Sequence, residues 1–259
     1  DRLAIAFRHS GWDIKYLLKQ IVLSETYRRS SEGKQSYAAD PTNRWLSRGA
    51  RFRRQGEFIR DLALATGGIL DPTLGGPGVK PYQPPGLWAE VGLGGNPKFS
   101  QDHGRKLYRR SLYTYWKRSA PPPSMQIFDA PTREKCTLQR PRTNTPLQAF
   151  VTLNDPQFVE ASRAMAERVL AEELQSEEDR IDFAYRLATA REPSARVLRA
   201  LSLLLEDATA TFRDSPEDAE KLIRVGESKP SNVASTETIA AYTTVCNVII
   251  NLDESLTRE

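Results

Sequence analysis

The stretch LNDPQFVEASRAMAERVL, residues 153–170, decides the fold class of this chain. Asp155 followed by Pro156 indicates a helix start, because an aspartate side chain caps the first free amides and proline suits the first helical position. Apolar residues then recur at the spacing of one helix face, at Phe158, Ala161, Met165 and Val169. We therefore expect this stretch to form a helix with a buried stripe.

Downstream of this helix the pattern stays helical, as in a helix bundle. One helix is expected around Ile181 to Ala188, and a second from Val197 to Ala208, each with apolar residues three and four apart. Ser215 caps a third helix that begins with a proline and ends at Gly226, and the last helix runs from about 236 to 252.

Upstream, two more helices are predicted before residue 67. Asp13 starts the first, which carries a stripe of apolar residues at Ile14, Leu17, Leu18, Ile21 and Val22. The second follows a turn at 40–43, buries Phe52 and Ile59, and stops at Gly67. Its opposite face is expected to carry a stripe of arginines, namely Arg44, Arg48, Arg51 and Arg54.

The segment between these helical parts has a different composition. Residues 67–97 are too rich in glycine and proline for regular structure, so we expect a long loop that Tyr82, Leu87 and Trp88 anchor by packing. Residues 107–118 are rich in tyrosine and tryptophan, which favours a short strand or one side of a hairpin. Prolines and capping residues then alternate from 121 to 156, with a further helix start at Thr145 and Pro146.

The sequence thus predicts a mainly α, bundle-like domain with a long Gly/Pro-rich central loop and a short β-hairpin or strand. We expect one domain over 1–259, with helices in 1–66, loop and strand in 67–118, and capped turns followed by the bundle in 119–259. The first residues lack an initiator methionine and the pattern of a targeting segment, so we expect a C-terminal fragment of a larger protein.

Composition excludes several classes of site and function. No run approaches the roughly 18 apolar residues that a membrane span needs. Two cysteines and two histidines without paired spacing exclude a zinc cluster, an iron–sulfur site or haem attachment, so no cofactor is expected in this chain. A disulfide between Cys136 and Cys246 remains open, but Cys246 lies among apolar residues at helical spacing and is predicted to be a core residue.

Charge is divided unevenly along the chain. Residues 1–150 hold 25 Lys and Arg against 12 Asp and Glu, a net charge of +13, whereas residues 151–259 hold 12 against 21, a net charge of −9. This split favours an internal contact between the halves, or a basic face for an anionic partner. The acidic second half disfavours nucleic acid as that partner.

Several motifs resemble those of one family. FDAPTREKC (128–136), RPRTNTPLQAF (140–150), LNDPQFVEASR (153–163) and the closing NVIINLDESLTRE resemble the planctomycete domain of unknown function that lies C-terminal to planctomycete cytochrome c modules. Segments near the start, such as WDIKYLLKQIVLSETYRRSS, fit the same pattern, so that the resemblance covers nearly the whole chain.

The resemblance implies an architecture rather than a mechanism. It implies a multidomain protein that is periplasmic, secreted or at the cell surface, where an anionic polysaccharide would suit a basic face. Haem c would lie in an N-terminal module outside this chain, and this domain would be a neighbour of that module. The family brings no catalytic residues that can be carried over. Whether the chain is an enzyme is therefore left open.

Two functional hypotheses follow. The first is an interaction or scaffold domain that packs against a neighbouring domain of the same polypeptide. The second is a polysaccharide-binding or polysaccharide-degrading domain, whose anionic ligand would be held by charge-assisted hydrogen bonds. Its candidate site consists of Asp129, Arg133, Arg142 and Asn144, with Trp88 and Trp116 beside them. The alternative role of the four polar residues is to cap helices and hold the turns.

Overall fold

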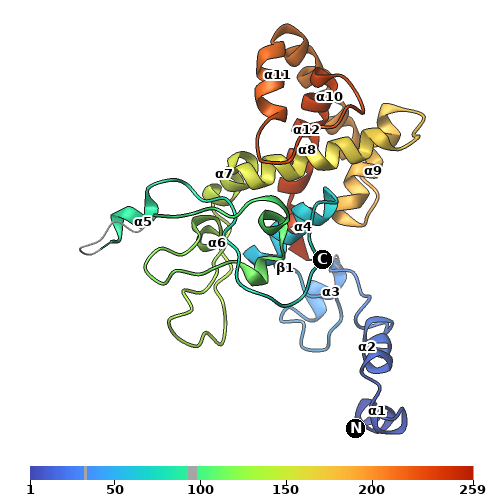
Figure 1. The fold of residues 1–259 in the computed structure, drawn as a ribbon. Helices are drawn as coiled ribbons and strands as arrows, with labels where there is room; N and C mark the ends of the chain where they lie inside the picture. The colour runs from blue at the N-terminus through green and yellow to red at the C-terminus, as the bar shows by residue number, and fades with distance from the viewer. Residues whose placement is uncertain (32–33, 93–97, 259) are drawn as a thin grey trace. The chain divides into compact units, whose positions relative to one another are not determined.

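The computed structural model describes residues 1–31, 34–92 and 98–258. The chain divides into two compact units, one formed by Asp1–Phe52 with the last residues from Thr257, the other by Arg53–Leu256. Within the described residues the fold is mainly helical, with thirteen α-helices, two short 3-10 helices and a two-stranded antiparallel sheet (Figure 1). The predicted fold class is confirmed.

The two units differ in size and in their elements. The first unit contains α1 (Arg2–His9), α2 (Ile14–Val22) and α3 (Lys34–Ala39). The strands of the sheet are β1 (Phe52–Arg53) and β2 (Thr257–Arg258). The second unit contains α4 (Gly56–Thr66), α5 (Leu87–Glu90), η1 (Gly104–Tyr108), η2 (Ser111–Tyr113), α6 (Pro123–Ile127), α7 (Pro146–Asn154), α8 (Pro156–Ala171), α9 (Glu177–Thr189), α10 (Ala195–Asp214), α11 (Pro216–Ile223), α12 (Thr236–Asn251) and α13 (Asp253–Leu256).

The core of the second unit forms around α8 and α12. Helix α12 packs against α8, α10 and α11, and α4 lies on α8, so that these helices form one bundle (Figure 1). The predicted stripe of α8 is buried along its length, as are Val245, Cys246 and Ile249 of α12. Asp155 caps α8 by accepting a hydrogen bond from the amide of Gln157, which confirms the predicted helix start.

Cys246 is a core residue, as the sequence predicts. Its side chain is completely buried, and this burial raises the pKa of the thiol to about 12. Cys136 is exposed, and both cysteines are free thiols.

The prediction of a strand at 107–118 is wrong. This segment forms η1 and η2, with isolated bridges from Arg109 to Asp71 and from Thr114 to Val79. The physical reason is Arg60 of α4, whose buried guanidinium donates to the carbonyls of Leu107 (2.6 Å) and Arg109 (2.9 Å). Carbonyls held by a side chain are not available for a strand ladder.

The predicted second helix begins later than expected. Helix α4 starts at Gly56, and Arg44, Arg48, Arg51 and Arg54 precede it, so they do not form a stripe on a helix. Residues 40–48 instead fold around Asp40, whose carboxylate accepts the amides of Arg44 (2.8 Å) and Trp45 (2.9 Å). Arg48 closes this turn by donating to the carbonyl of Asp40.

The Gly/Pro-rich loop is ordered by packing over its described part, residues 67–92; positions 93–97 of the predicted loop lie outside the described residues. The Arg109 guanidinium gathers three loop carbonyls, donating to those of Thr73, Gly75 and Pro77. The loop therefore has a fixed course. Its described part is irregular up to Gly86 and then forms the short helix α5, which corrects the expectation of no regular structure.

Truncation of Ile249 to alanine is expected to lower the free energy of unfolding by about 2–5 kcal/mol, because it opens a cavity in the centre of the bundle. The matched control is Leu203→Ala on α10, since that leucine is 58% exposed and should cost less than about 1 kcal/mol. Urea unfolding followed by circular dichroism measures both, and an equal cost for the two variants would contradict this account of the core.

Candidate functional site

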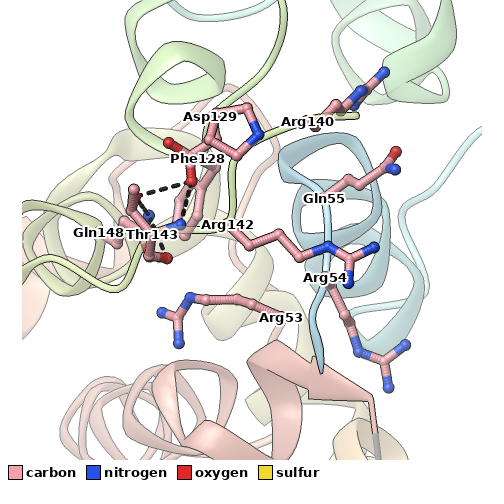
Figure 2. Close-up of a pocket in the computed structure, with 10 residues that line it drawn as sticks. Arg53, Arg54, Gln55, Phe128, Asp129, Arg140, Arg142, Thr143 and Gln148 are labelled. Carbon is pink, nitrogen blue, oxygen red and sulfur yellow. Dashed lines mark hydrogen bonds between the residues drawn. The ribbon is translucent and has the colours of Figure 1, made fainter. Parts of the chain in front are cut away.

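A small pocket in the second unit gathers four arginines, and we call it the arginine pocket (Figure 2). Residues 53–55 before α4, residues 128–129 after α6, residues 140–143 and the side chain of Gln148 on α7 form its walls. Asp129 is the only acidic residue in the described lining, so the pocket carries an excess of positive charge. Of the candidate residues predicted from the sequence, Asp129 and Arg142 meet in this pocket.

Asp129 holds the wall of this pocket together. Its carboxylate accepts hydrogen bonds from the amide (2.7 Å) and the hydroxyl (2.8 Å) of Thr143 (Figure 2). Its backbone lies in the left-handed region, with a φ of 59°, which turns the chain out of α6. The carboxylate thus fastens the 140–143 segment across the turn, which is the structural role that the sequence left open for it.

Carboxylate partners are found for Arg140 and Arg53. Arg140 forms an ion pair with Glu57 of α4 at 2.8 Å, and Arg53 lies 3.7 Å from Asp253. Burial lowers the pKa of the Arg53 guanidinium. Part of the positive charge of the arginine pocket is therefore neutralised by carboxylates of the same domain.

The arginine pocket has a volume of about 10 Å³ for the centres of water-sized molecules, enough for about one water molecule. Among the buried polar atoms of its described lining, Nε of Arg53 and Oε1 of Gln148 have no hydrogen-bond partner. The volume leaves room for about one water molecule beside them. A sugar ring needs far more room.

The other candidate residues lie elsewhere. Arg133 stacks on the ring of Trp116, with its guanidinium carbon 4.6 Å from the ring centroid, and the Trp116 indole donates to the carbonyl of Thr132. Asn144 is exposed and does not line the arginine pocket. The structure therefore joins Arg133 to Trp116 but does not bring either of them, or Trp88, into the arginine pocket.

Trp88 belongs to an aromatic cluster with lysines around it. Its ring centroid lies 5.3 Å from that of Phe99 and 5.9 Å from that of Tyr115. The ammonium group of Lys117 lies 4.5 Å from the Trp88 ring centroid, and that of Lys80 lies 5.6 Å from it. These contacts surround the indole with positive charge.

A wider depression in the second unit was not predicted as a site. We call it the apolar basin; it has a volume of about 560 Å³ and a mainly apolar lining. Leu147 and Phe150 of α7, which are 59% and 63% exposed, line it together with Pro84 and Pro85 of the central loop. A sign of this site was available in the sequence, because apolar residues occur on several faces of α7, and a helix of this kind cannot bury all of them in one core contact.

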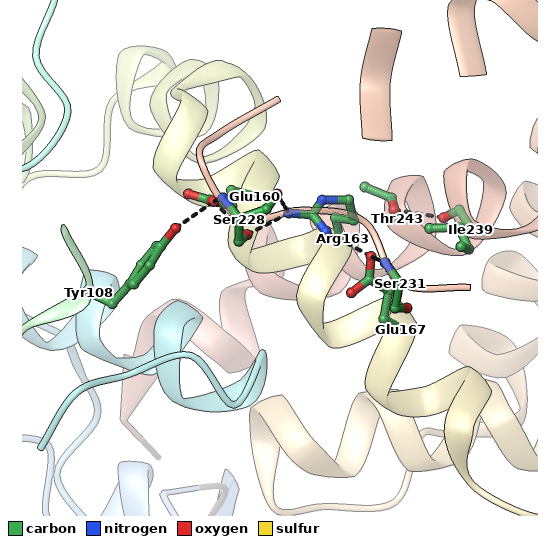
Figure 3. A network of polar contacts seen from close by, with 8 residues as sticks. All are labelled: Tyr108, Glu160, Arg163, Glu167, Ser228, Ser231, Ile239 and Thr243. Carbon is green, nitrogen blue, oxygen red and sulfur yellow. Dashed lines mark hydrogen bonds and ion pairs between the residues drawn. The ribbon is translucent and has the colours of Figure 1, made fainter. Parts of the chain in front are cut away.

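A buried carboxylate fixes the part of the central loop that lines the apolar basin, residues 82–85. Glu160 of α8 accepts hydrogen bonds from the hydroxyls of Tyr82 (2.9 Å) and Tyr108 (2.8 Å). It also accepts the amide and the hydroxyl of Ser228, both at 2.6 Å (Figure 3). Tyr82 immediately precedes residues 83–85 of the basin wall, so Glu160 positions that wall from within the core.

The same network binds the loop that follows α11. Arg163, one turn after Glu160, is buried and donates to the carbonyl and hydroxyl of Ser228 and to Glu167 (Figure 3). Glu227 accepts the amide of Gly104 and lies 2.7 Å from His103, and these two contacts lower the pKa of its carboxyl. Sequence reasoning missed Glu160 and Arg163, because a charged residue on a helix is usually solvated.

Comparison with known proteins identifies the family. The family model described as Protein of unknown function (DUF1553), PSD1, matches residues 1–205. The chain belongs to this family. Comparison with curated proteins and with solved structures found no match. The resemblance to the planctomycete domain is confirmed, and the matched part of this DUF1553 domain ends inside α10.

Membrane-spanning and metal-binding features are absent from the described part of the DUF1553 domain. None of its described helices is sufficiently long and apolar to pass through a bilayer. Among residues 1–31, 34–92 and 98–258, no cluster of three or more histidine, cysteine or acidic side chains has the arrangement of a metal site.

Replacing Gly226 with alanine is expected to lower the free energy of unfolding by more than about 3 kcal/mol. Its φ is 93°, and a Cβ there would lie 2.6 Å from Cγ and Oε1 of Glu160. The matched control is Gly68→Ala, with a φ of 72° and open space around it, which should cost only the left-handed strain of about 1–2 kcal/mol. Thermal and urea unfolding of the two variants measure the difference, and equal costs would argue against a tightly packed Glu160.

Tyr108→Phe is expected to change how stability depends on pH. Burial, followed by the bond to Glu160, raises the pKa of Tyr108 to about 12, whereas an unfolded tyrosine ionises near 10. The stabilisation is therefore complete below pH 10 and is lost as the pH rises toward 12. Urea unfolding at pH 8 should show the variant less stable by about 1 kcal/mol. This difference should shrink by pH 11.5, and a constant difference would contradict the assignment.

Proposed function

We propose that this DUF1553 domain is an interaction domain of a multidomain, extracytoplasmic protein that also carries a c-type cytochrome module. Its proposed contact face is the exposed apolar side of α1 and α2. Family membership supports a multidomain setting. The single observation that carries the proposal is that helices α1 and α2 contain no buried residue.

The apolar stripe predicted near the start of the sequence lies on α2, and much of it is exposed to solvent. Ile14, Leu18 and Val22 lie one turn apart and are 65%, 54% and 42% exposed. Burial of a side chain of this size contributes about 1.5–3 kcal/mol. Covering these three side chains would therefore contribute several kcal/mol to a contact with another domain, on the order of three times that value.

Helix length gives a second reason to expect a partner. Helix α1 has eight residues and α2 has nine, and isolated helices shorter than about 12–15 residues are marginal in water. Asp13 caps α2 through the amide of Tyr16, which stabilises its start by about 1 kcal/mol. A cap alone does not compensate for an uncovered apolar face, so a covering surface would supply the missing stabilisation.

The proposed occupant of this face is another domain of the same polypeptide. Lys15 and Lys19 flank the apolar stripe on α2, so the covering surface should carry acidic residues at its rim. A neighbour in the same chain has a high effective concentration, which compensates for the small area of a two-helix face. In this arrangement the DUF1553 domain would hold an electron-transfer module in position and would not carry out a reaction on it.

Hydrogen exchange tests this proposal. In the intact multidomain protein, the amides of α2 are expected to exchange about tenfold or more slowly than in residues 1–259 alone, because the partner domain covers the face. The amides of α10 serve as the internal reference. Equal exchange of α2 in the two proteins would refute the contact.

A double substitution gives the matched control. Ile14→Asp with Leu18→Asp should restore fast exchange of α2 in the intact protein, whereas Leu203→Asp, an equally exposed leucine on α10, should leave it slow. Sedimentation of residues 1–259 alone should show a monomer. A dimer that the α2 substitutions abolish would assign the face to a second copy of this chain and overturn the proposal.

A further inference from the structure

The apolar basin continues into a second depression, which we call the Trp88 basin. The Trp88 basin has a volume of about 320 Å³ and is lined by Trp88, Phe99 and Lys98, among others. Gln83, Pro85 and Gln101 line both basins, so the two share a wall. The two basins adjoin at these residues and we treat them together as one groove, whose described lining residues all belong to the second unit.

The two ends of the groove differ in chemistry. The apolar basin presents Leu147, Phe150, Val151 and Ile127, which suit an aliphatic or aromatic side chain. The acidic residue of its described lining, Asp155, is occupied by the amide and side chain of Gln157, and burial raises the pKa of its carboxyl. This end therefore offers hydrophobic contact and little charge.

The other end is basic. Lys98 is exposed and lines the Trp88 basin, whose lining contains no acidic residue among the described residues. Lys80 and Lys117 lie against the Trp88 ring. An occupant of this end should be negatively charged, because Lys98 has no counter-charge in the described lining and Lys80 and Lys117 add positive charge around the Trp88 ring.

Two buried donors belong to residues of the groove wall, Gln83 of both basins and Trp88 of the Trp88 basin. The side-chain amide nitrogen of Gln83 and the indole nitrogen of Trp88 are buried and have no hydrogen-bond partner. An unmade hydrogen bond at a buried donor costs about 1–3 kcal/mol. Both atoms are donors, so the molecule that completes them must offer acceptors such as carbonyl oxygens.

We propose that this groove binds an extended acidic peptide segment, with an apolar side chain in the apolar basin and acidic side chains near Lys98 and the lysines beside the Trp88 ring. Its backbone carbonyls accept from Gln83 and Trp88. In an extended chain, side chains on the same face recur every two residues, about 6.8 Å apart, so the acidic residues lie two and four positions from the apolar one. This partner is independent of the contact proposed for α1 and α2.

A peptide fits the groove better than an acidic oligosaccharide does. The lining of the apolar basin consists mainly of leucine, valine, isoleucine, phenylalanine and proline side chains. Sugar hydroxyls buried there would lose their hydrogen bonds to water without replacement, which is costly. An extended peptide can place one apolar side chain in this basin and still offer carbonyls to the two donors.

Selection from a library of displayed random decapeptides on the purified chain of residues 1–259 tests the proposal. The expected result is enrichment of sequences with an apolar residue and with aspartate or glutamate two to four positions away from it. The selected peptide, labelled with fluorescein, should bind with an affinity that falls as sodium chloride is raised. No enrichment, or enrichment of basic peptides, would overturn the proposal.

Variants assign the binding to the groove. Phe150→Ala should weaken the selected peptide by about tenfold, and Lys98→Glu should weaken it by about fivefold and reduce the salt dependence. Phe150 and Lys98 are both exposed, so neither change threatens the fold. Leu203→Ala and Lys135→Glu, which remove an exposed leucine and an exposed lysine outside the groove, should leave affinity unchanged. Loss in the controls, or tighter groove-dependent binding of polygalacturonate than of the peptide, would refute a peptide site.

Discussion

The constraint on which the second unit depends is the burial of α8 on all sides. Its apolar stripe lies in the core, yet Gln157, Glu160 and Arg163 on its other faces are buried as well. A buried charge or amide is tolerated only when partners satisfy it. For α8 these partners come from segments far away in sequence, including Arg60, Tyr82, Tyr108 and Ser228. The irregular loops are therefore fixed by the polar side of a helix.

The same constraint explains which parts of the fold the sequence predicts. The helices around α8, α9, α10 and α12 follow from apolar spacing and capping residues, which are local signals. The strand predicted at 107–118 failed because Arg60, about 47 residues earlier, takes the carbonyls of that segment. For α2 the sequence correctly predicts the apolar stripe. It does not predict that the stripe is exposed, because exposure depends on which other segments pack against the helix.

The candidate site divides in a similar way. Sequence reasoning placed Asp129 and Arg142 together, and the structure puts both in the arginine pocket beside Arg53 and Gln148. It did not find Glu160, because a glutamate within a helix gives no local sign of burial. Nor did it find the groove, whose walls come from 83–85, 98–101 and α7, and no spacing rule joins these segments.

The hold of Arg109 on the central loop has a consequence for the environments in which this domain keeps its shape. Its guanidinium closes the chain between residues 73–77 and 109, a task that small extracellular domains often give to a disulfide. Both cysteines of the chain are free, so this closure involves no redox chemistry. The loop should therefore stay closed under reducing and oxidising conditions alike. Water or ions that compete for the Arg109 hydrogen bonds would loosen it, whereas a reducing agent would not.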